Sequence, residues 1–209
     1  MTHPQAGRHL AETTRLETFA DGVFAIAITL LVLEIKVPAL EETRNGLWPA
    51  LARLWPSYVG YLVSFLTIGI MWVNHHAIFQ YIRRCDRRFL FANVFFLMGI
   101  AFVPFPTAVL AEHLPDPVTR NAAAVFFSGW YVLLAVMFNI LWHTGIGGGG
   151  RLLRDNVHQE GLETITRRYR IGPISYVVTA AVALVSAWAS LALFFGLAVF
   201  WALSERTDG

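Results

Sequence analysis

The stretch RLETFADGVFAIAITLLVLEIKVP, from Arg15 to Pro38, decides the fold. Between Asp21 and Glu34 it has no charged side chain, and Thr29 supplies the only hydrogen-bonding side chain there. A helix that crosses a bilayer needs about 20 such residues. The run is too long for a signal peptide and lacks a small-residue cleavage site. We therefore predict a retained first membrane span over 16–37.

Composition supports a membrane protein. The 209 residues are 56% hydrophobic, whereas a soluble domain is about 45–50% apolar. The net charge of +2 is too small to indicate nucleic acid binding. Cys85 is the only cysteine, so no intrachain disulfide can form. We expect an all-α integral membrane protein with one domain over 1–209.

The remaining apolar runs predict further spans, giving six in total. These are 54–82, 89–111, 120–144, 172–187 and 188–204. The last two come from one stretch near 30 residues long, which as a single helix would measure about 45 Å against a core of about 30 Å. Two helices with a turn near 186–190 fit better, although one tilted helix stays an alternative. The prolines of VPFPT, at 103–107, should bend or end the third span.

Loop charges predict the orientation, because cytoplasmic loops are rich in Arg and Lys. The two basic loops contain Arg83, Arg84, Arg87 and Arg88, and Arg151, Arg154, Arg167, Arg168 and Arg170. The opposite loops carry Glu41, Glu42, Glu112 and Asp116 among fewer arginines. Both termini are therefore expected in the cytoplasm. We expect a multi-pass protein of the cell membrane, the inner membrane of a bacterium.

Several polar residues lie at the cytoplasmic ends of the first two spans. Asp21 could simply cap its helix, since an Asp near a helix start satisfies free amides. However, Arg15 lies one to two turns upstream, and Trp72, Asn74 and His75 end the second span. Ionisable groups at membrane depth usually face partners or water. We predict an Arg15–Asp21 pair, bridged by a histidine or asparagine, that holds the two spans together.

The first span carries two adjacent stripes at helical spacing. The small-residue stripe comprises Gly22, Ala25 and Thr29, and the apolar stripe comprises Ile26, Leu30 and Leu33. Small residues allow helices to approach closely. Thr29 has two interpretations: it packs with its hydroxyl bonded to a carbonyl one turn earlier, or it lines a pore.

The chain shows no pattern of an enzyme or of a metal site. His75 and the adjacent His76 point about 100° apart on a helix, so they would chelate poorly. A Ser-His-Asp pattern, a phosphate-binding glycine loop and paired catalytic carboxylates are all missing from the sequence. We expect a protein that is not an enzyme and that uses no cofactor and no metal site.

The stretch 15–38 resembles the first-span signature of the transmembrane protein 175 family of potassium channels. That signature is Arg, three residues and then Phe-Ser-Asp-Gly, and its matches here are Arg15, Phe19, Asp21 and Gly22. Ala20 replaces the serine, which removes one hydrogen-bonding group. SFLTIGIMWVNHHAIF at 64–79 and FVPFPT at 102–107 resemble the second and third spans of the family.

The resemblance implies a homotetramer with six spans per subunit, in which the first span of each copy lines a central potassium pathway. Its partners would be other copies of itself and the lipid bilayer. The constriction would be formed by Ile26, Leu30 and Leu33, with Thr29 giving a layer of hydroxyls. Arg15, Asp21, Trp72 and a partner near His75, such as Asn74, would form a polar network behind the pore. The Thr-Val-Gly-Tyr-Gly filter of ordinary potassium channels is absent from this sequence.

Two other functions remain alternatives at this stage. A small proton-coupled transporter or permease could relay protons through Arg15, Asp21 and His75. The spans argue against it, since they hold few ionisable groups beyond Asp21 and Glu34. A membrane enzyme or assembly factor would need a catalytic or interaction motif that the sequence does not show.

Overall fold

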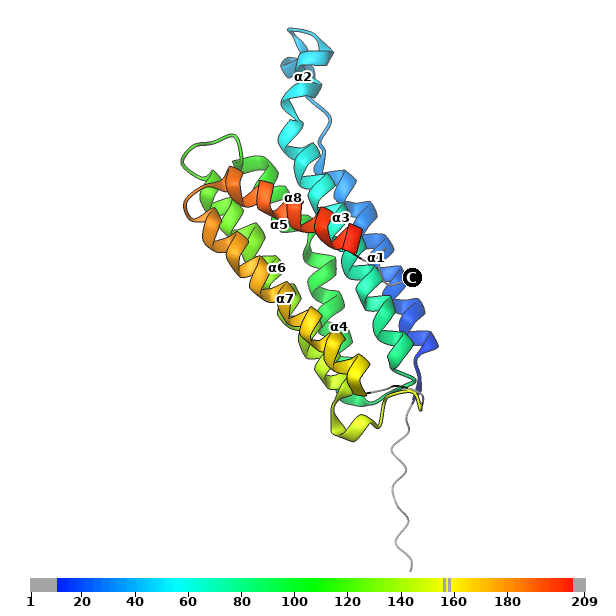
Figure 1. Cartoon of the computed structure of the whole chain (residues 1–209). Coiled ribbons are helices and arrows are strands. Elements are labelled where there is room, and N and C mark those ends of the chain that lie inside the picture. The colour runs from blue at the N-terminus through cyan, green and yellow to red at the C-terminus, as the bar shows by residue number, and fades with distance from the viewer. Residues whose placement is uncertain (1–10, 156, 158, 205–209) are drawn as a thin grey trace, which may run out of the picture.

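A helical bundle is formed by residues 11–155, 157 and 159–204, which the computed structural model describes. Its helices are α1 (Thr14–Leu30), α2 (Leu47–Arg53), α3 (Trp55–Tyr81), α4 (Arg87–Phe102), α5 (Pro104–His113), α6 (Arg120–Ile146), α7 (Gln159–Ala183) and α8 (Ala187–Ser204). A 3-10 turn, η1 (Leu31–Glu34), extends α1. The axes of the long helices are roughly aligned, α8 crosses them obliquely and α2 projects beyond one end (Figure 1).

Within the described residues, four segments are long and apolar enough to cross a membrane. They are Thr14–Glu34, Trp55–Tyr81, Arg87–His113 and Arg120–Ile146. A shorter apolar helix covers Ala187–Trp201. The structure thus shows a helical bundle with four candidate membrane-spanning segments, while the full set of six spans stays a prediction.

The third predicted span breaks between α4 and α5, where the two prolines of the sequence lie. Pro104 and Pro106 lack the amide hydrogens that would continue the ladder of α4. Thr107 repairs part of this break, because its hydroxyl donates to the carbonyl of Val103 at 2.8 Å. The same hydroxyl lies 2.7 Å from that of Ser64, so the break is also tied to α3.

The last apolar stretch divides into α7 and α8 at residues 184–186, slightly before the turn expected near 186–190. In addition, α7 begins at Gln159, thirteen residues before the start predicted for the fifth span at 172. Polar residues hold this early part of α7 against α6, since Trp142 Nε1 donates to Thr166 Oγ1 at 2.9 Å. Tertiary contacts thus extend the helix over polar residues that precede the predicted span.

The helix α7 continues through Pro173 because a neighbouring helix replaces the lost bond. A proline cannot donate to the carbonyl four residues earlier, here that of Tyr169. Asn139 of α6 donates to this carbonyl through Nδ2 at 3.1 Å. In an apolar environment a freed carbonyl needs such a partner, so Asn139 allows the proline to lie inside a helix.

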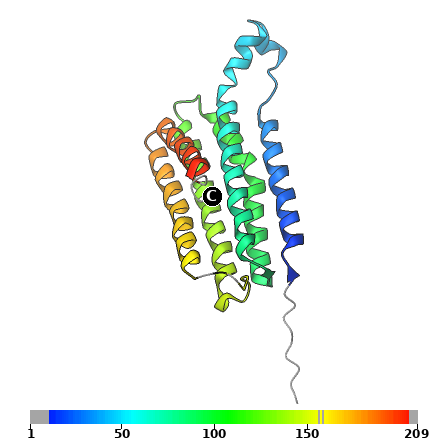
Figure 2. The same cartoon turned by 45° about the vertical axis from the view of Figure 1, so that its right-hand side comes forward.

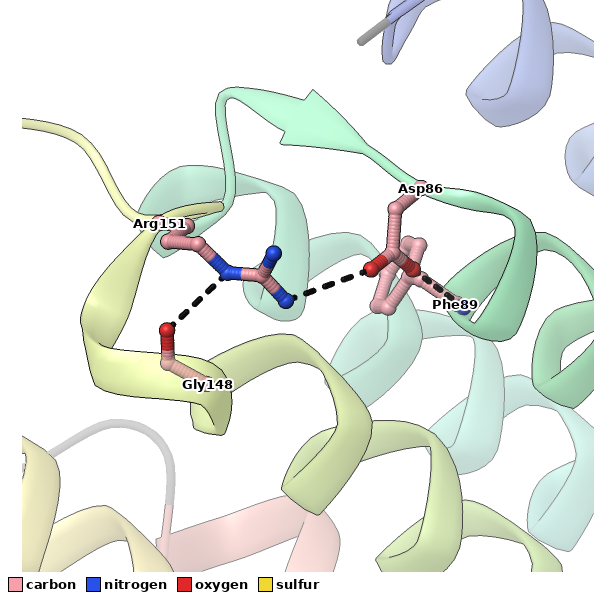
Figure 3. A network of polar contacts seen from close by, with 4 residues as sticks. All are labelled: Asp86, Phe89, Gly148 and Arg151. Carbon is pink, nitrogen blue, oxygen red and sulfur yellow. Dashed lines mark hydrogen bonds and ion pairs between the residues drawn. The ribbon is translucent and has the colours of Figure 1, made fainter. Parts of the chain in front are cut away.

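At one end of the bundle the two basic loops are joined. The short strands β1 (Ala11–Glu12) and β2 (Arg84–Cys85) pair antiparallel, and Ile82 pairs with Leu153 of the linker after α6. Asp86 caps α4 by accepting from the amide of Phe89 at 3.0 Å. Figure 3 shows Arg151 between Asp86 and the Gly148 carbonyl, at 3.7 and 3.0 Å. The Asp86 carboxylate therefore both caps α4 and pairs with Arg151 of the linker.

The positive φ angles of Gly148, Gly149 and Gly150, all between 64° and 74°, explain the glycine run. Residues with a side chain rarely adopt this conformation, so glycine permits the tight turn that brings Arg151 toward Asp86. The run GGGG therefore forms a defined turn in the structure.

Replacement of Asp86 by Ala should lower the free energy of unfolding by about 1 kcal/mol, because the cap of α4 is lost. Asp86→Asn should retain most of this stability, since Asn caps a helix as well as Asp does. Thermal unfolding of the purified protein, followed by tryptophan fluorescence, measures both effects.

The matched control for Asp86→Ala is Asp155→Ala. Asp155 forms only a solvent-exposed pair with Arg83 at 3.3 Å, and exposed pairs contribute little. Equal losses of stability in Asp86→Ala and Asp155→Ala would show that the cap does not hold this end together.

Candidate functional site

The helix α1 has one buried face and one exposed apolar face. Its buried residues are Leu16, Ala20, Phe24, Ala27 and, in η1, Leu31. The opposite face carries large apolar side chains that are uncovered within one chain: Phe19 (56% exposed), Ile26 (60%), Leu30 (41%) and Leu33 (66%). Figure 2 shows α1 at the outer edge of the bundle. The predicted constriction residues thus lie together on a face that the rest of the chain leaves open.

Phe24 anchors the buried face of α1 between α3 and α4. Its ring centroid lies 5.4 Å from that of His75 and 6.1 Å from that of Phe96. The His75 ring in turn stacks on Phe96 at 5.7 Å, with an angle of 14° between the planes. These three rings come from three helices, so their contact fixes the rotation of α1 and the direction of its outer face.

Thr29 lies on the exposed side of α1, beside Ile26. Its hydroxyl donates to the carbonyls of Ala25 and Ile26, at 3.0 and 2.9 Å. The bond back to the preceding turn matches the packing interpretation, but the side chain is exposed in the single chain. Because the hydrogen is used inside the helix, the oxygen lone pairs of Thr29 remain available on the outer face.

Asp21 is bound to α3 and is not a helix cap. It lies in the second turn of α1, whose cap position is Thr13. Its Oδ1 accepts a hydrogen bond from Trp72 Nε1 at 2.8 Å. The predicted connection between the first two spans is therefore present, with Trp72 as the partner.

The predicted pair between Arg15 and Asp21 is not observed. Among the described residues, no ion pair or hydrogen bond joins the two side chains. Six residues turn a helix by about 600°, which leaves Arg15 and Asp21 about 120° apart. By the same geometry Arg15 lies on the face of Ile26.

The buried partner of His75 is Asn93 of α4, a residue that the sequence analysis missed. His75 Nε2 donates to Asn93 Oδ1 at 2.7 Å, and both side chains are almost fully buried. Asn74, which we expected in the network with Arg15 and Asp21, instead donates to the carbonyl of Ile70 in its own helix at 2.9 Å. A signal for Asn93 was present, because it is the only polar side chain between Phe89 and Phe102.

The structure does not assemble Arg15, Asp21 and His75 into one cluster. Asp21 bonds to Trp72, His75 bonds to Asn93, and Arg15 projects from another face of α1. The part of the chain that the structure describes also contains no group of three or more His, Cys, Asp or Glu placed to hold a metal ion.

Comparison with known proteins places this arrangement in a family. A potassium channel of Chamaesiphon minutus is 47% identical over 197 residues, which is 94% of this chain and 96% of that protein. The chain belongs to the TMEM175 family. The family described as "Endosomal/lysosomal potassium channel TMEM175" matches residues 15–104. Because this is a family of ion channels, the TMEM175 chain is not an enzyme.

The fold of this TMEM175 chain agrees with a solved relative. The crystal structure of a C. minutus homologue, described as a lysosomal potassium-selective channel TMEM175 homolog, superposes with a TM-score of 0.84 at 44% identity. The match covers 94% of this chain and 98% of that one. A more distant human relative, named endosomal/lysosomal proton channel TMEM175, is 30% identical, and the match covers 72% of this chain and 31% of that protein.

The replacement Asn93→Leu should destabilise the protein by about 1–3 kcal/mol, because it leaves the buried His75 donor without an acceptor. Asn74→Leu is the matched control, since the Asn74 amide bonds only within its own helix. Thermal unfolding in detergent compares the two variants. Equal stability of both variants would mean that the His75–Asn93 bond does not hold α3 and α4 together.

Proposed function

We propose that this TMEM175 chain forms a potassium-permeable channel whose pathway is lined by the outer face of α1. The observation that carries the proposal is the uncovered stripe of Ile26, Leu30 and Leu33 on a helix otherwise packed into the bundle. The name potassium channel of the C. minutus relative, which matches nearly the whole chain, supports the same function.

One α1 helix cannot enclose a pathway, so the proposal requires several copies. We infer a homotetramer with six membrane spans per subunit, in which four α1 helices surround a central axis. The low burial of the first span supports this, since 22% of it is buried against 44% or more in the other three candidates. Both termini would lie in the cytoplasm, in agreement with the basic loops.

A ring of Ile26 side chains would form the hydrophobic constriction, with Leu30 and Leu33 beyond it. Hydrophobic necks of this kind control conduction by excluding water. Thr29 would place hydroxyl oxygens next to the neck, and their outward lone pairs could replace part of the hydration shell of a cation. The Trp72–Asp21 bond would hold α1 in the rotation that keeps these groups on the axis.

A second candidate function is proton conduction, because the human relative is named a proton channel. The geometry gives it less support. Asp21 and His75 have separate partners, so the structure contains no relay between them through Arg15. The experiment below includes a proton gradient for this reason.

The replacement Ile26→Asn should raise ion flux and lower the preference for potassium over sodium, because a polar ring would keep the neck hydrated. Liposomes containing the purified protein and subjected to potassium, sodium and proton gradients provide the measurement. Val32→Asn is the matched control, since Val32 is 50% exposed but lies about 160° from Leu30 and about 120° from Ile26 around the helix.

Flux and ion preference that stay at wild-type values in Ile26→Asn would remove Ile26 from the pathway. If only the proton gradient drives flux, the function is proton conduction and not potassium conduction. A change in Val32→Asn as large as that in Ile26→Asn would show that the effect does not come from one face of α1.

A further inference from the structure

A large cavity lies on the side of the bundle away from α1. It has a volume of about 770 Å³ and is bounded by the end of α6, the glycine turn and the first half of α7. Its lining residues are His143, Ile146, Gly149, Gly150, Leu153, Leu162, Glu163, Thr166, Arg167 and Arg170. In both Figure 1 and Figure 2, α6 and α7 lie across the bundle from α1, so this cavity is separate from the proposed pathway.

The charge of the cavity lining is mainly positive. Arg167 and Arg170 line it from α7, and Glu163 is the only acid among the lining residues. Among the described residues, no hydrogen bond or ion pair occupies either guanidinium group. Some other arginines at this end are paired, for example Arg83 with Asp155 and Arg151 with Asp86. Among the described residues, Arg167 and Arg170 share this hollow without such a partner.

His143 adds a third nitrogen group to the lining. Its Nδ1 lies 2.8 Å from the carbonyl of Asn139, and since a carbonyl can only accept, Nδ1 carries the hydrogen. In the neutral ring Nε2 then carries a lone pair and can only accept. The donors for an anion that enters the cavity are therefore Arg167 and Arg170 of α7.

The wall that carries the arginines is held in place. Trp142 donates to Thr166 at 2.9 Å, and Asn139 donates to the carbonyl of Tyr169 at 3.1 Å. The rings of Trp142 and Tyr169 also meet edge to face, with centroids 5.2 Å apart. These contacts lie next to Arg167 and Arg170 in the chain, so they fix the part of the α7 backbone that carries both arginines.

The remaining lining fits a lipid. Ile146, Leu153 and Leu162 give the cavity an apolar side. The cavity also lies near the end of the bundle that the loop charges predict to be cytoplasmic, where a bilayer exposes anionic headgroups. Guanidinium groups bind phosphate oxygens in pairs of charge-assisted hydrogen bonds.

We propose that this cavity binds the phosphate-bearing headgroup of an anionic membrane lipid, with Arg167 and Arg170 as its ligands. The headgroup occupies the basic side, and the first part of an acyl chain lies along the apolar side. Bound in this way, the lipid links the ends of α6 and α7 and fills a hollow at the surface of the bundle.

The double variant Arg167→Gln/Arg170→Gln tests this assignment. Each basic side chain near a membrane surface strengthens the binding of an anionic lipid. The loss of both arginines should therefore weaken the affinity for phosphatidylglycerol roughly 30-fold. Binding is measured on the full-length protein in neutral detergent by native mass spectrometry and by the thermal shift that added lipid produces. Arg44→Gln/Arg53→Gln is the matched control, since it removes two charges near α2 at the other end of the bundle.

We expect phosphatidylglycerol to raise the unfolding temperature of the wild type and phosphatidylcholine to raise it only slightly. Only Arg167→Gln/Arg170→Gln should lose the shift with phosphatidylglycerol. Arg167→Lys/Arg170→Lys should retain part of the shift, which keeps the test valid if the glutamine variant folds poorly. Equal shifts in wild type and both glutamine variants would overturn the proposal. So would a shift with inorganic phosphate but none with the lipid, because the ligand would then be a free anion.

Discussion

The packing of Phe24 between His75 and Phe96 is the contact on which the proposed pathway depends. It buries one face of α1 in the bundle and so forces the opposite face, with Ile26 and Leu33, to project outward. A rotation of α1 by one residue would carry the stripe about 100° around the helix. The bond from Trp72 to Asp21 opposes such a rotation at a second point. The direction of the outer face is therefore set by contacts inside each subunit.

Polar groups inside this apolar bundle are mostly used to join helices. His75 with Asn93 connects α3 to α4, and Asn139 with the Tyr169 carbonyl connects α6 to α7. Such groups cannot turn to water in a bilayer, so each one requires a partner and thereby specifies which helices are neighbours. The paired polar groups also explain how the bundle tolerates Pro173 inside α7. Apolar side chains alone could pack against many partners. The polar pairs and the close ring contacts together select which helices lie side by side.

Hydropathy and proline positions predicted much of the fold because these signals are local. The first four apolar segments and the break after Phe102 could be read from the pattern along the chain, whereas the outward position of Ile26 was implied only by the resemblance to the family. The partners of polar residues could not, since Asn74 and Asn93 look equally suitable until the rotations of α3 and α4 are known. The early start of α7 was missed for the same reason, because its polar first half is helical through contacts with α6. The pairing of Asp21 with Trp72 and not with Arg15 likewise follows from tertiary geometry.

Thiol modification tests most directly whether the outer face of α1 lines an ion pathway. The measurement is potassium flux through reconstituted Ile26→Cys before and after treatment with a small, charged, thiol-specific reagent. The native Cys85 is buried, and this burial raises the pKa of its thiol, so the wild type should be unaffected. The account predicts that modification at position 26 blocks flux, while modification of Val32→Cys leaves it unchanged. Full flux after complete modification at position 26 would contradict it.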